Sequence, residues 1–318
     1  MLDAITDVRG ISVGHAQNET ALTGCTVVLA GEGAVVGADV RGLAPGTRET
    51  DLCRPGTLVE RAQAIFLTGG SAFGLDVAGG VMRYLHERDL GFTTGTVRVP
   101  IVPGAVIFDL DIGQPRWPDA GTGYHACLAA GTGTVAQGNA GAGAGATVGK
   151  FLGLEQAMKG GIGTASRRLG DATVGALIVV NALGNVVYPE TGRALAGARS
   201  PETGEVVDAA SVLLPEGRSS NTTIGVVATD AALTPVEAHR LAAAAHDGLA
   251  IVIRPTHTLY DGDAIFALAT GEAGSADIHP VALHVAVVDV VTRAIINAVT
   301  NARSVGGLPA ARDLRPDV

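Results

Sequence analysis

Short apolar runs rich in β-branched residues alternate along the chain with polar, glycine-containing turns. The first two runs, CTVVLA and AVVGADV, are separated by Gly-Glu-Gly, which predicts a β-hairpin. A longer run, TVGALIVVNALGNVV, predicts a strand with a turn at Leu183-Gly-Asn. The predicted strands are 25–30, 34–40, 64–68, 173–187, 222–229, 250–254 and 264–269.

Helical spacing of apolar residues marks the segments between these strands. Residues 72–87 place Phe73, Val77, Val81 and Leu85 at helical intervals. A second helix is predicted to open at Thr234-Pro-Val-Glu237, which has the pattern of a capping box. Other predicted helices are 58–63, 124–130 and 281–302. The alternation of helices and strands favours an α/β fold that contains both parallel and antiparallel strands.

Composition narrows the class of protein. The chain has 318 residues, 47% of them hydrophobic and only 3% aromatic, with glycine at 45 positions, so we expect one large domain whose core is built from aliphatic side chains. The net charge of −9 disfavours nucleic acid as a partner. The N-terminus has no secretory pattern, and the best apolar stretch, Val281–Val291, contains His284 and Asp289, so we expect a cytoplasmic protein with no membrane partner.

Neither a cofactor nor a metal ion is expected. The glycine-rich segment 138–149 does not fit a phosphate loop, because Ala144 and Phe151 stand where that motif needs Gly and a hydroxyl residue. The histidines show no metal-binding motif. Cys25, Cys53 and Cys127 lie far apart in the sequence, which indicates buried, reduced thiols.

The junction SSNTTIGVVATD offers a nucleophile. It joins the polar stretch 189–220 to the predicted strand 222–229, with a Thr at the boundary. If the preceding peptide bond were cut, that Thr would carry a nucleophilic hydroxyl and its own α-amine as base, whose pKa is about 7.7–8.0. Thr-Thr at the start of a strand is also ordinary β-propensity. The residues alone leave both interpretations open.

A second cluster lies at Asp261-Gly-Asp263. Residues two apart in an extended segment face the same side, which would place both carboxylates together with Gly262 leaving that side open. Carboxylates so close do not both ionise without cost, so one of them would be protonated or paired with a cation. The alternative is a solvated Asp-Gly-Asp surface turn.

A resemblance covers nearly the whole chain. In order, the segments ITDVRGISVGHA with LTGCTVVL, LTGGSAFGLD, EQAMKGGIGTAS, VGALIVVNALG, NTTIGVVATDA and DGDAIFALATG resemble the L-aminopeptidase D-amidase/esterase (DmpA) family, which includes β-aminopeptidases and nylon-oligomer hydrolases. The resemblance implies a four-layer αββα sandwich similar to N-terminal-nucleophile hydrolases, as a single domain. It also implies a precursor that cleaves itself before a Ser or Thr, which then becomes the nucleophile.

Carried over by position, the resemblance places the cleavage between Asn221 and Thr222 and makes Thr222 the nucleophile, with Thr223 as the rival. It further implies that Asp261 and Asp263 contact the nucleophile and its α-amine. The remaining expected site residues are Asn181 as a donor to the oxyanion, Lys159 as a tuner of proton transfer, and Tyr124 as a contact to substrate or oxyanion.

The expected mature protein holds an α chain of residues 1–221 and a β chain of 222–318, assembled as a homo-oligomer, commonly a tetramer of αβ units. Its substrates would be small peptides, amino-acid amides or amide oligomers. The resemblance leaves open L-amino-acid amides, β-peptides, D-amino esters and 6-aminohexanoate oligomers. Alternatives from other classes are an acyltransferase of the ornithine acetyltransferase type and an uncleaved small-molecule binding protein.

Overall fold

The computed structural model describes residues 1–209, 221–274 and 278–314. Its largest element is a nine-stranded mixed sheet with the strand order β10-β11-β14-β16-β2-β4-β7-β3, and β1 pairs with β2 beside this path. The strands of this sheet are β1 (Ser12–Asn18), β2 (Thr23–Val40), β3 (Thr47–Arg48), β4 (Arg61–Thr68), β7 (Gly104–Val106), β10 (Gly161–Leu169), β11 (Ala172–Asn181), β14 (Thr222–Thr229) and β16 (Ala264–Ala269).

Smaller strands and the helices complete the fold. The small sheets contain β5 (Phe92–Thr93) with β6 (Arg98–Val99), β8 (Thr147–Val148) with β9 (Met158–Lys159), and β12 (Asn185–Val187) with β13 (Ala194–Ala196) and β15 (Ile253–Arg254). The helices are α1 (Val77–His86), α2 (Ala120–Leu128), α3 (Pro235–Val252), α4 (Pro280–Thr300) and α5 (Ala311–Leu314).

The predicted hairpin at residues 25–40 is wrong, because these residues form the single long strand β2. Its first half pairs with β1 and its second half pairs with β16, with a register shift against β4 between Leu29 and Ala34. Gly31 and Gly33 have φ of +55° and +112°, a region that favours glycine. The Gly-Glu-Gly motif therefore distorts one strand instead of reversing the chain, and β2 passes from one layer of sheet to the next.

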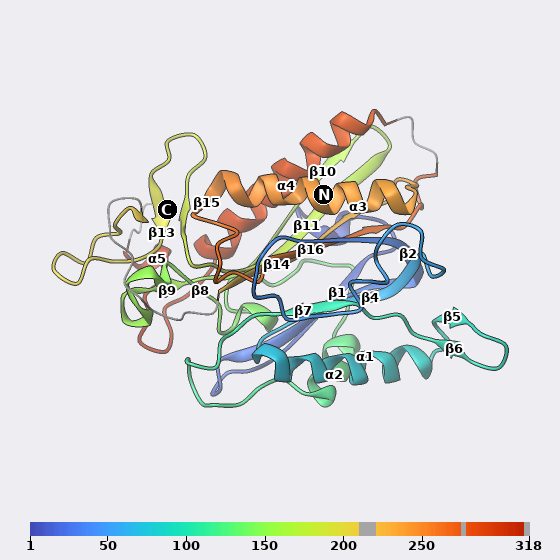
Figure 1. The fold of residues 1–318 in the computed structure, drawn as a ribbon, viewed down its shortest axis with the longest axis horizontal. Coiled ribbons are helices and arrows are strands. Elements are labelled where there is room, and N and C mark those ends of the chain that lie inside the picture. The colour runs from blue at the N-terminus through green and yellow to red at the C-terminus, as the bar shows by residue number, and fades with distance from the viewer. Residues whose placement is uncertain (210–220, 275–277, 315–318) are drawn as a thin grey trace.

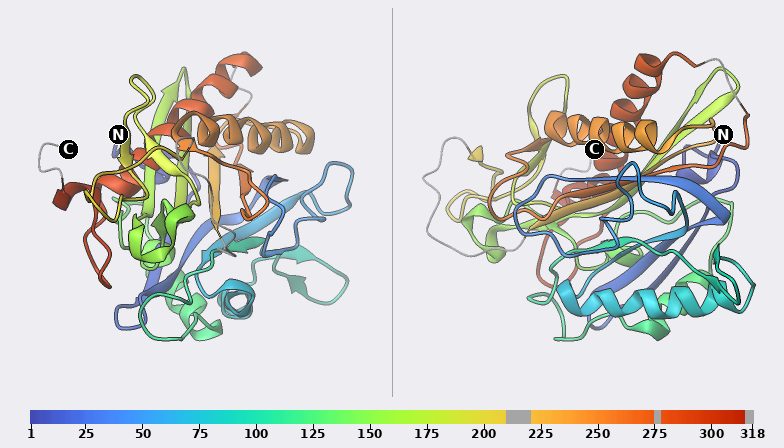
Figure 2. Two further views of the ribbon diagram at one scale, coloured as in Figure 1. Left: turned by 60° about the vertical axis from the view of Figure 1, so that its left-hand side comes forward. Right: turned by 45° about the vertical axis from the view of Figure 1, so that its right-hand side comes forward.

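The αββα arrangement is visible in how the apolar side chains are divided. One core packs α3 and α4 onto β10, β11, β14 and β16, a second lies between the two sheet layers, and a third packs α1 and α2 onto β2 and β4. Figure 1 shows α3 and α4 above the strands and α1 and α2 below them. Figure 2 shows the two sheet layers crossing between these helices. The predicted four-layer α/β fold is confirmed.

Two local predictions fail for tertiary reasons. Residues 61–63, predicted as the end of a helix, belong instead to strand β4, which also contains the predicted strand 64–68 and completes the sheet between β2 and β7. Helix α3 continues to Val252, where a strand was predicted, because Leu249 and Val252 extend its buried face. Its start is as predicted, since the Thr234 hydroxyl accepts a hydrogen bond from Glu237 N at 3.3 Å.

Helix α4 is long and apolar enough on average to cross a membrane, and half of that stretch is buried inside the fold. It lies against β10 and β11, and its buried residues belong to the same core as those of α3. Its apolar character is therefore accounted for by packing on the sheet.

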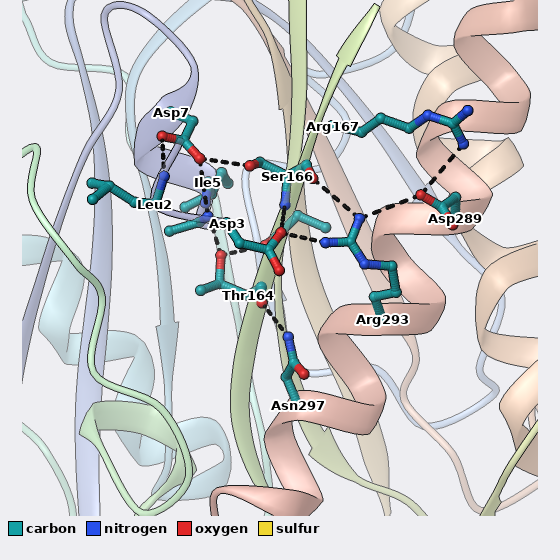
Figure 3. Close-up of polar contacts among 12 residues, drawn as sticks. Leu2, Asp3, Ile5, Asp7, Thr164, Ser166, Arg167, Asp289, Arg293 and Asn297 are labelled. Atoms are coloured by element: carbon teal, nitrogen blue, oxygen red, sulfur yellow. Dashed lines mark hydrogen bonds and ion pairs between the residues drawn. The ribbon is translucent and has the colours of Figure 1, made fainter.

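The N-terminal segment is fastened to β10 and α4 by a polar network (Figure 3). Asp7 accepts hydrogen bonds from Leu2 N at 2.8 Å and from Ser166 Oγ at 2.6 Å. Arg293 of α4 joins the carboxylates of Asp3 and Asp289. Burial raises the pKa of Asp7, but these hydrogen bonds outweigh it and hold the pKa below its usual value.

We predict that Asp7→Asn lowers the free energy of unfolding at pH 7 by about 1 kcal/mol, because an amide replaces a hydrogen-bonded carboxylate. A depressed pKa contributes stability above the unfolded-state pKa, about 3.9, and loses it as the pH falls further. Thermal unfolding at several pH values measures this: the gap between wild type and Asp7→Asn should narrow below about pH 4. A gap that stays constant down to pH 2 would contradict the assignment.

Candidate active site

The junction between Asn221 and Thr222 lies at the start of β14, between two strands that come from distant parts of the chain. Thr222 pairs with Asn181 at the end of β11, and Asn221 forms a parallel bridge with Asp261. β14 runs antiparallel to β11 and parallel to β16. The end of β11 and the segment just before β16 therefore both lie beside the start of β14. Thr222 is buried there, with 5% of its surface exposed.

The Asn221–Thr222 peptide is held from both sides. Asn221 N donates to Tyr260 O at 3.0 Å, and Gly262 N donates to Asn221 O at 2.9 Å. The Thr222 hydroxyl also donates to Asn221 O. A side chain at position 262 would place its Cβ 2.5 Å from Ala44 O and 3.0 Å from Thr222 Oγ1, so glycine is required for this close approach.

Asp261 and Asp263 are buried, with 2% and 1% of their surface exposed, which excludes the solvated surface turn. Asp261 accepts hydrogen bonds from Thr258 N at 2.7 Å and from Thr258 Oγ1 at 2.6 Å. Burial and the neighbouring charge of Asp263 raise the pKa of Asp261. Hydrogen bonds from Thr258 only partly oppose this rise.

Asp263 joins two segments of the site. Its Oδ1 accepts Thr223 N at 2.6 Å, and its Oδ2 accepts His257 Nδ1 at 2.7 Å, His257 N at 3.2 Å and Thr256 Oγ1 at 3.2 Å. The expected contact to the nucleophile is therefore made one residue later, at the backbone of Thr223. This carboxylate fixes the first residues of β14 in place.

Asn181 interrupts an apolar strand, and every polar atom of its side chain is bonded. Its Oδ1 accepts Thr147 N at 3.0 Å and Lys150 Nζ at 2.9 Å, and its Nδ2 donates to Phe108 O at 3.1 Å. The backbone donor of Thr147 identifies the oxygen end of this amide, so the Nδ2 atom is the end that offers donors.

Lys150 is the functional residue that the sequence interpretation missed. Its Nζ is buried and donates to both the side chain and the carbonyl oxygen of Asn181, at 2.9 and 3.0 Å. Burial lowers its pKa to about 7, and the charges of Asp261 and Asp109 oppose this fall. The signal in the sequence was a lysine flanked by GATVG and FLG, where no other charged residue accompanies it.

Comparison with known proteins identifies the family. A model of peptidase family S58 matches residues 3–312. The chain belongs to this family. It is 47% identical to an uncharacterized aminopeptidase of Mycobacterium tuberculosis over 99% of this chain and 98% of the relative. It is 35% identical to the 6-aminohexanoate-oligomer endohydrolase of Kocuria sp. over 84% of this chain and 74% of the relative.

A solved structure places the S58 chain in a fold class. The L-aminopeptidase D-Ala-esterase/amidase from Ochrobactrum anthropi, described as a new variant of the Ntn hydrolase fold, superposes with a TM-score of 0.72. The two chains share 22% sequence identity, and the match covers 97% of this chain and 88% of the other. This likeness shows the N-terminal-nucleophile hydrolase fold. The match to peptidase family S58 makes the chain a hydrolase of peptide or amide bonds, as predicted.

The S58 structure does not bring every expected residue to the cluster. Lys159 is fully buried, but its Nζ donates to the carbonyl oxygens of Ala144 and Ala146 at 2.9 and 2.7 Å. Its strand β9 pairs with β8, so it lies behind Thr147 and supports the strand that contacts Asn181. Lys150, and not Lys159, donates a hydrogen bond to Asn181.

Tyr124 lies elsewhere, in α2 of the outer helical layer. Its hydroxyl donates to Glu87 Oε2 at 2.7 Å, and the guanidinium of Arg83 lies 4.0 Å from its ring centre. Gly123 and Ala126 form the buried side of α2, which turns Tyr124 towards α1. The expected substrate contact of Tyr124 is therefore not supported by the structure.

The cysteines do not take part in the site. Cys25, Cys53 and Cys127 are free and buried, as predicted. Among the described residues, no group of His, Cys, Asp and Glu side chains is arranged to hold a metal ion.

We predict that Asp263→Asn lowers the free energy of unfolding by about 2–4 kcal/mol, because one amide NH₂ would face the N–H donors of Thr223 or His257. Asp261→Asn is the matched control, since its carboxylate bonds Thr258 and the backbone of Leu183 but neither of the first residues of β14. We expect a loss of about 1 kcal/mol for that variant. Chemical denaturation measures both, and equal losses would contradict the different roles given to the carboxylates.

Proposed function

We propose that this chain is the precursor of a self-cleaving amide hydrolase in which Thr222 becomes the N-terminal nucleophile. The observation that carries the proposal is the arrangement at the junction: the Thr222 hydroxyl lies on the carbonyl group of the residue before it, and Gly262 N holds the same carbonyl oxygen. The hydroxyl and its electrophile are thus already adjacent in the uncut chain.

In the proposed self-cleavage, Thr222 Oγ1 bonds to the carbonyl carbon of Asn221 and gives its proton to a base. Negative charge develops on Asn221 O, where the Gly262 N–H is already placed to stabilise it. The C–N bond then breaks, the leaving nitrogen takes a proton, and an ester joins Asn221 to the Thr222 side chain. Water hydrolyses the ester, which leaves a carboxylate on Asn221 and a free α-amine on Thr222.

The precursor needs a base other than the α-amine, because the Thr222 nitrogen is still part of an amide. Lys150 fits this requirement, since burial lowers its pKa to about 7 and allows a neutral amine near neutral pH. Its Nζ contacts Asn181, whose backbone pairs with Thr222 across the sheet. We therefore assign to Lys150 the uptake of the hydroxyl proton during self-cleavage.

In the mature enzyme, the free α-amine of Thr222, with a pKa of about 7.7–8.0, becomes the base for its own hydroxyl. The hydroxyl attacks the substrate amide, the substrate's amine leaves, and water resolves the acyl ester. Asp263 holds Thr223 N next to the nucleophile. Asn181 Nδ2 donates one hydrogen to Phe108 O, and we assign its second hydrogen to the oxyanion of the acyl intermediate. The substrates we propose are small peptides or amides.

Thr223 does not compete for this role. Successive residues of a strand point to opposite faces, so its side chain lies on the other side of β14 from that of Thr222. Among the described residues, Thr223 Oγ1 has no hydrogen-bond partner that would activate it. The alternation of side chains along β14 therefore favours Thr222 over Thr223 as the nucleophile.

We predict two fragments on denaturing electrophoresis of the purified protein, the smaller one beginning Thr-Thr-Ile-Gly. Thr222→Ala should leave a single inactive chain, because the attacking hydroxyl is gone. Thr223→Val, which removes the neighbouring hydroxyl with little change of shape, should still be cut and active. A chain that stays intact yet hydrolyses amides, or the reverse outcome of the two variants, would refute the proposal.

We predict that Lys150→Met slows self-cleavage by about a hundredfold or more, the usual contribution of a general base. In the wild type, the rate should rise with pH through about 7, because the amine becomes neutral above its pKa. Time courses of cleavage after refolding at pH 5–9 measure this. Lys159→Met is the control, since Lys159 is equally buried with its pKa also lowered to about 7. If the increase of the cleavage rate with pH were lost in Lys159→Met but not in Lys150→Met, Lys159 rather than Lys150 would be the general base.

A further inference from the structure

We propose that His257 is a positioning residue for the nucleophile, acting through Asp263 on the first peptide of the mature β chain. This inference rests on the proposed function and adds to it a residue outside the reacting groups. His257 contacts neither Thr222 nor Asn181 among the hydrogen bonds of the described residues; it acts only through the carboxylate that holds Thr223 N.

The geometry around His257 is specialised. Its backbone has φ of +56°, a left-handed conformation that is uncommon for residues other than glycine. In that conformation both its backbone N–H and its ring Nδ1 reach the same oxygen of Asp263, at 3.2 and 2.7 Å. His257 therefore donates two hydrogen bonds to Oδ2 of Asp263, and Oδ1 of the same carboxylate accepts the bond from Thr223 N.

The hydrogen bonds that link His257, Asp263 and Thr223 N restrain the nucleophile more strongly relative to other contacts once the chain is cut. In the uncut chain, Asn221 is held by Tyr260 O and Gly262 N, and the peptide bond passes that restraint to Thr222. Cleavage removes the covalent link, and a new chain end tends to loosen unless it is tied down. The bond from Thr223 N to Asp263, at 2.6 Å, then becomes a tie directly next to the nucleophile.

The surroundings allow His257 to serve as a donor. Its ring meets that of His246 edge-on, with the centres 4.9 Å apart. Burial lowers the pKa of His246 to about 4, so this neighbouring ring is neutral near pH 7. The other charged groups nearby are Asp261, which bonds the next residue, Thr258, and Asp39 and Arg41, which act on His246.

The test compares His257→Leu with His257→Asn. Leu removes the ring donor. Asn places its Nδ2 near the position of Nδ1 and tolerates a left-handed backbone, so it should restore the bond. We expect His257→Leu to lower kcat by about tenfold to a hundredfold with KM changed less than about twofold, because a misplaced nucleophile loses transition-state stabilisation and not substrate contacts. His257→Asn should recover most of kcat.

The pH profile separates positioning from mere structural support. The acidic limb of the kcat profile should differ from that of the wild type in His257→Leu and return to it in His257→Asn, because only the second variant keeps a donor to the carboxylate of Asp263. His239→Asn is the matched control, because its Nδ1 bonds a backbone carbonyl, Ala38 O, at 2.8 Å and no carboxylate. Its profile should equal that of the wild type.

Different results would overturn the role of His257 and the proposed function. Equal losses in His257→Leu and His257→Asn with an unmoved acidic limb, or unchanged kinetics in both, would overturn the role of His257 while leaving Thr222 as the nucleophile. Activity that survives Thr222→Ala would instead overturn the proposed function itself. Thermal unfolding of both His257 variants, run beside the kinetics, identifies any loss of activity that comes from unfolding.

Discussion

The pairing of β14 with β11 on one side and β16 on the other is the constraint on which the site depends. The antiparallel ladder sets Thr222 opposite Asn181, and the parallel ladder sets Asn221 beside Asp261. Slipping either ladder by one residue would turn Thr222 to the opposite face of the sheet. Side chains of β14 pack alternately into the apolar cores on its two faces. This packing fixes the register of the strand and therefore also the position of Thr222.

That constraint also explains how ionisable groups stay buried at the junction. Desolvation of a charged side chain costs several kcal/mol unless partners compensate for it. Lys150 contacts Asn181, Asp261 contacts Thr258, and Asp263 contacts Thr223 N and His257. Burial raises the pKa of Asp261 and lowers that of Lys150. The same desolvation that destabilises the folded chain thus gives Lys150 a pKa of about 7, so that it can exchange a proton near neutral pH.

Sequence reasoning succeeded where local pattern and tertiary pairing agree. The strand 222–229 has the predicted bounds, and helix α4 (Pro280–Thr300) lies within two residues of its predicted range. It failed where packing between distant segments decides. The pattern of β2 resembled a hairpin because two glycines interrupt it, and only its two partners show that the strand continues. Lys150 escaped notice because its contact is with Asn181, 31 positions later in the chain. The role expected of Tyr124 stays a prediction, because position along the sequence does not show which way α2 faces, and the Tyr124 hydroxyl donates to Glu87.

The central claim is that Thr222 carries the acyl group during turnover. The most direct measurement is mass spectrometry of enzyme quenched in acid during hydrolysis of an activated ester of a small acyl group, followed by peptide mapping. The account predicts a mass increase equal to the acyl group on the peptide that begins at Thr222, absent from Thr222→Ala. Acylation of a different residue, or turnover in which the peptide beginning at Thr222 never gains that mass, would contradict it.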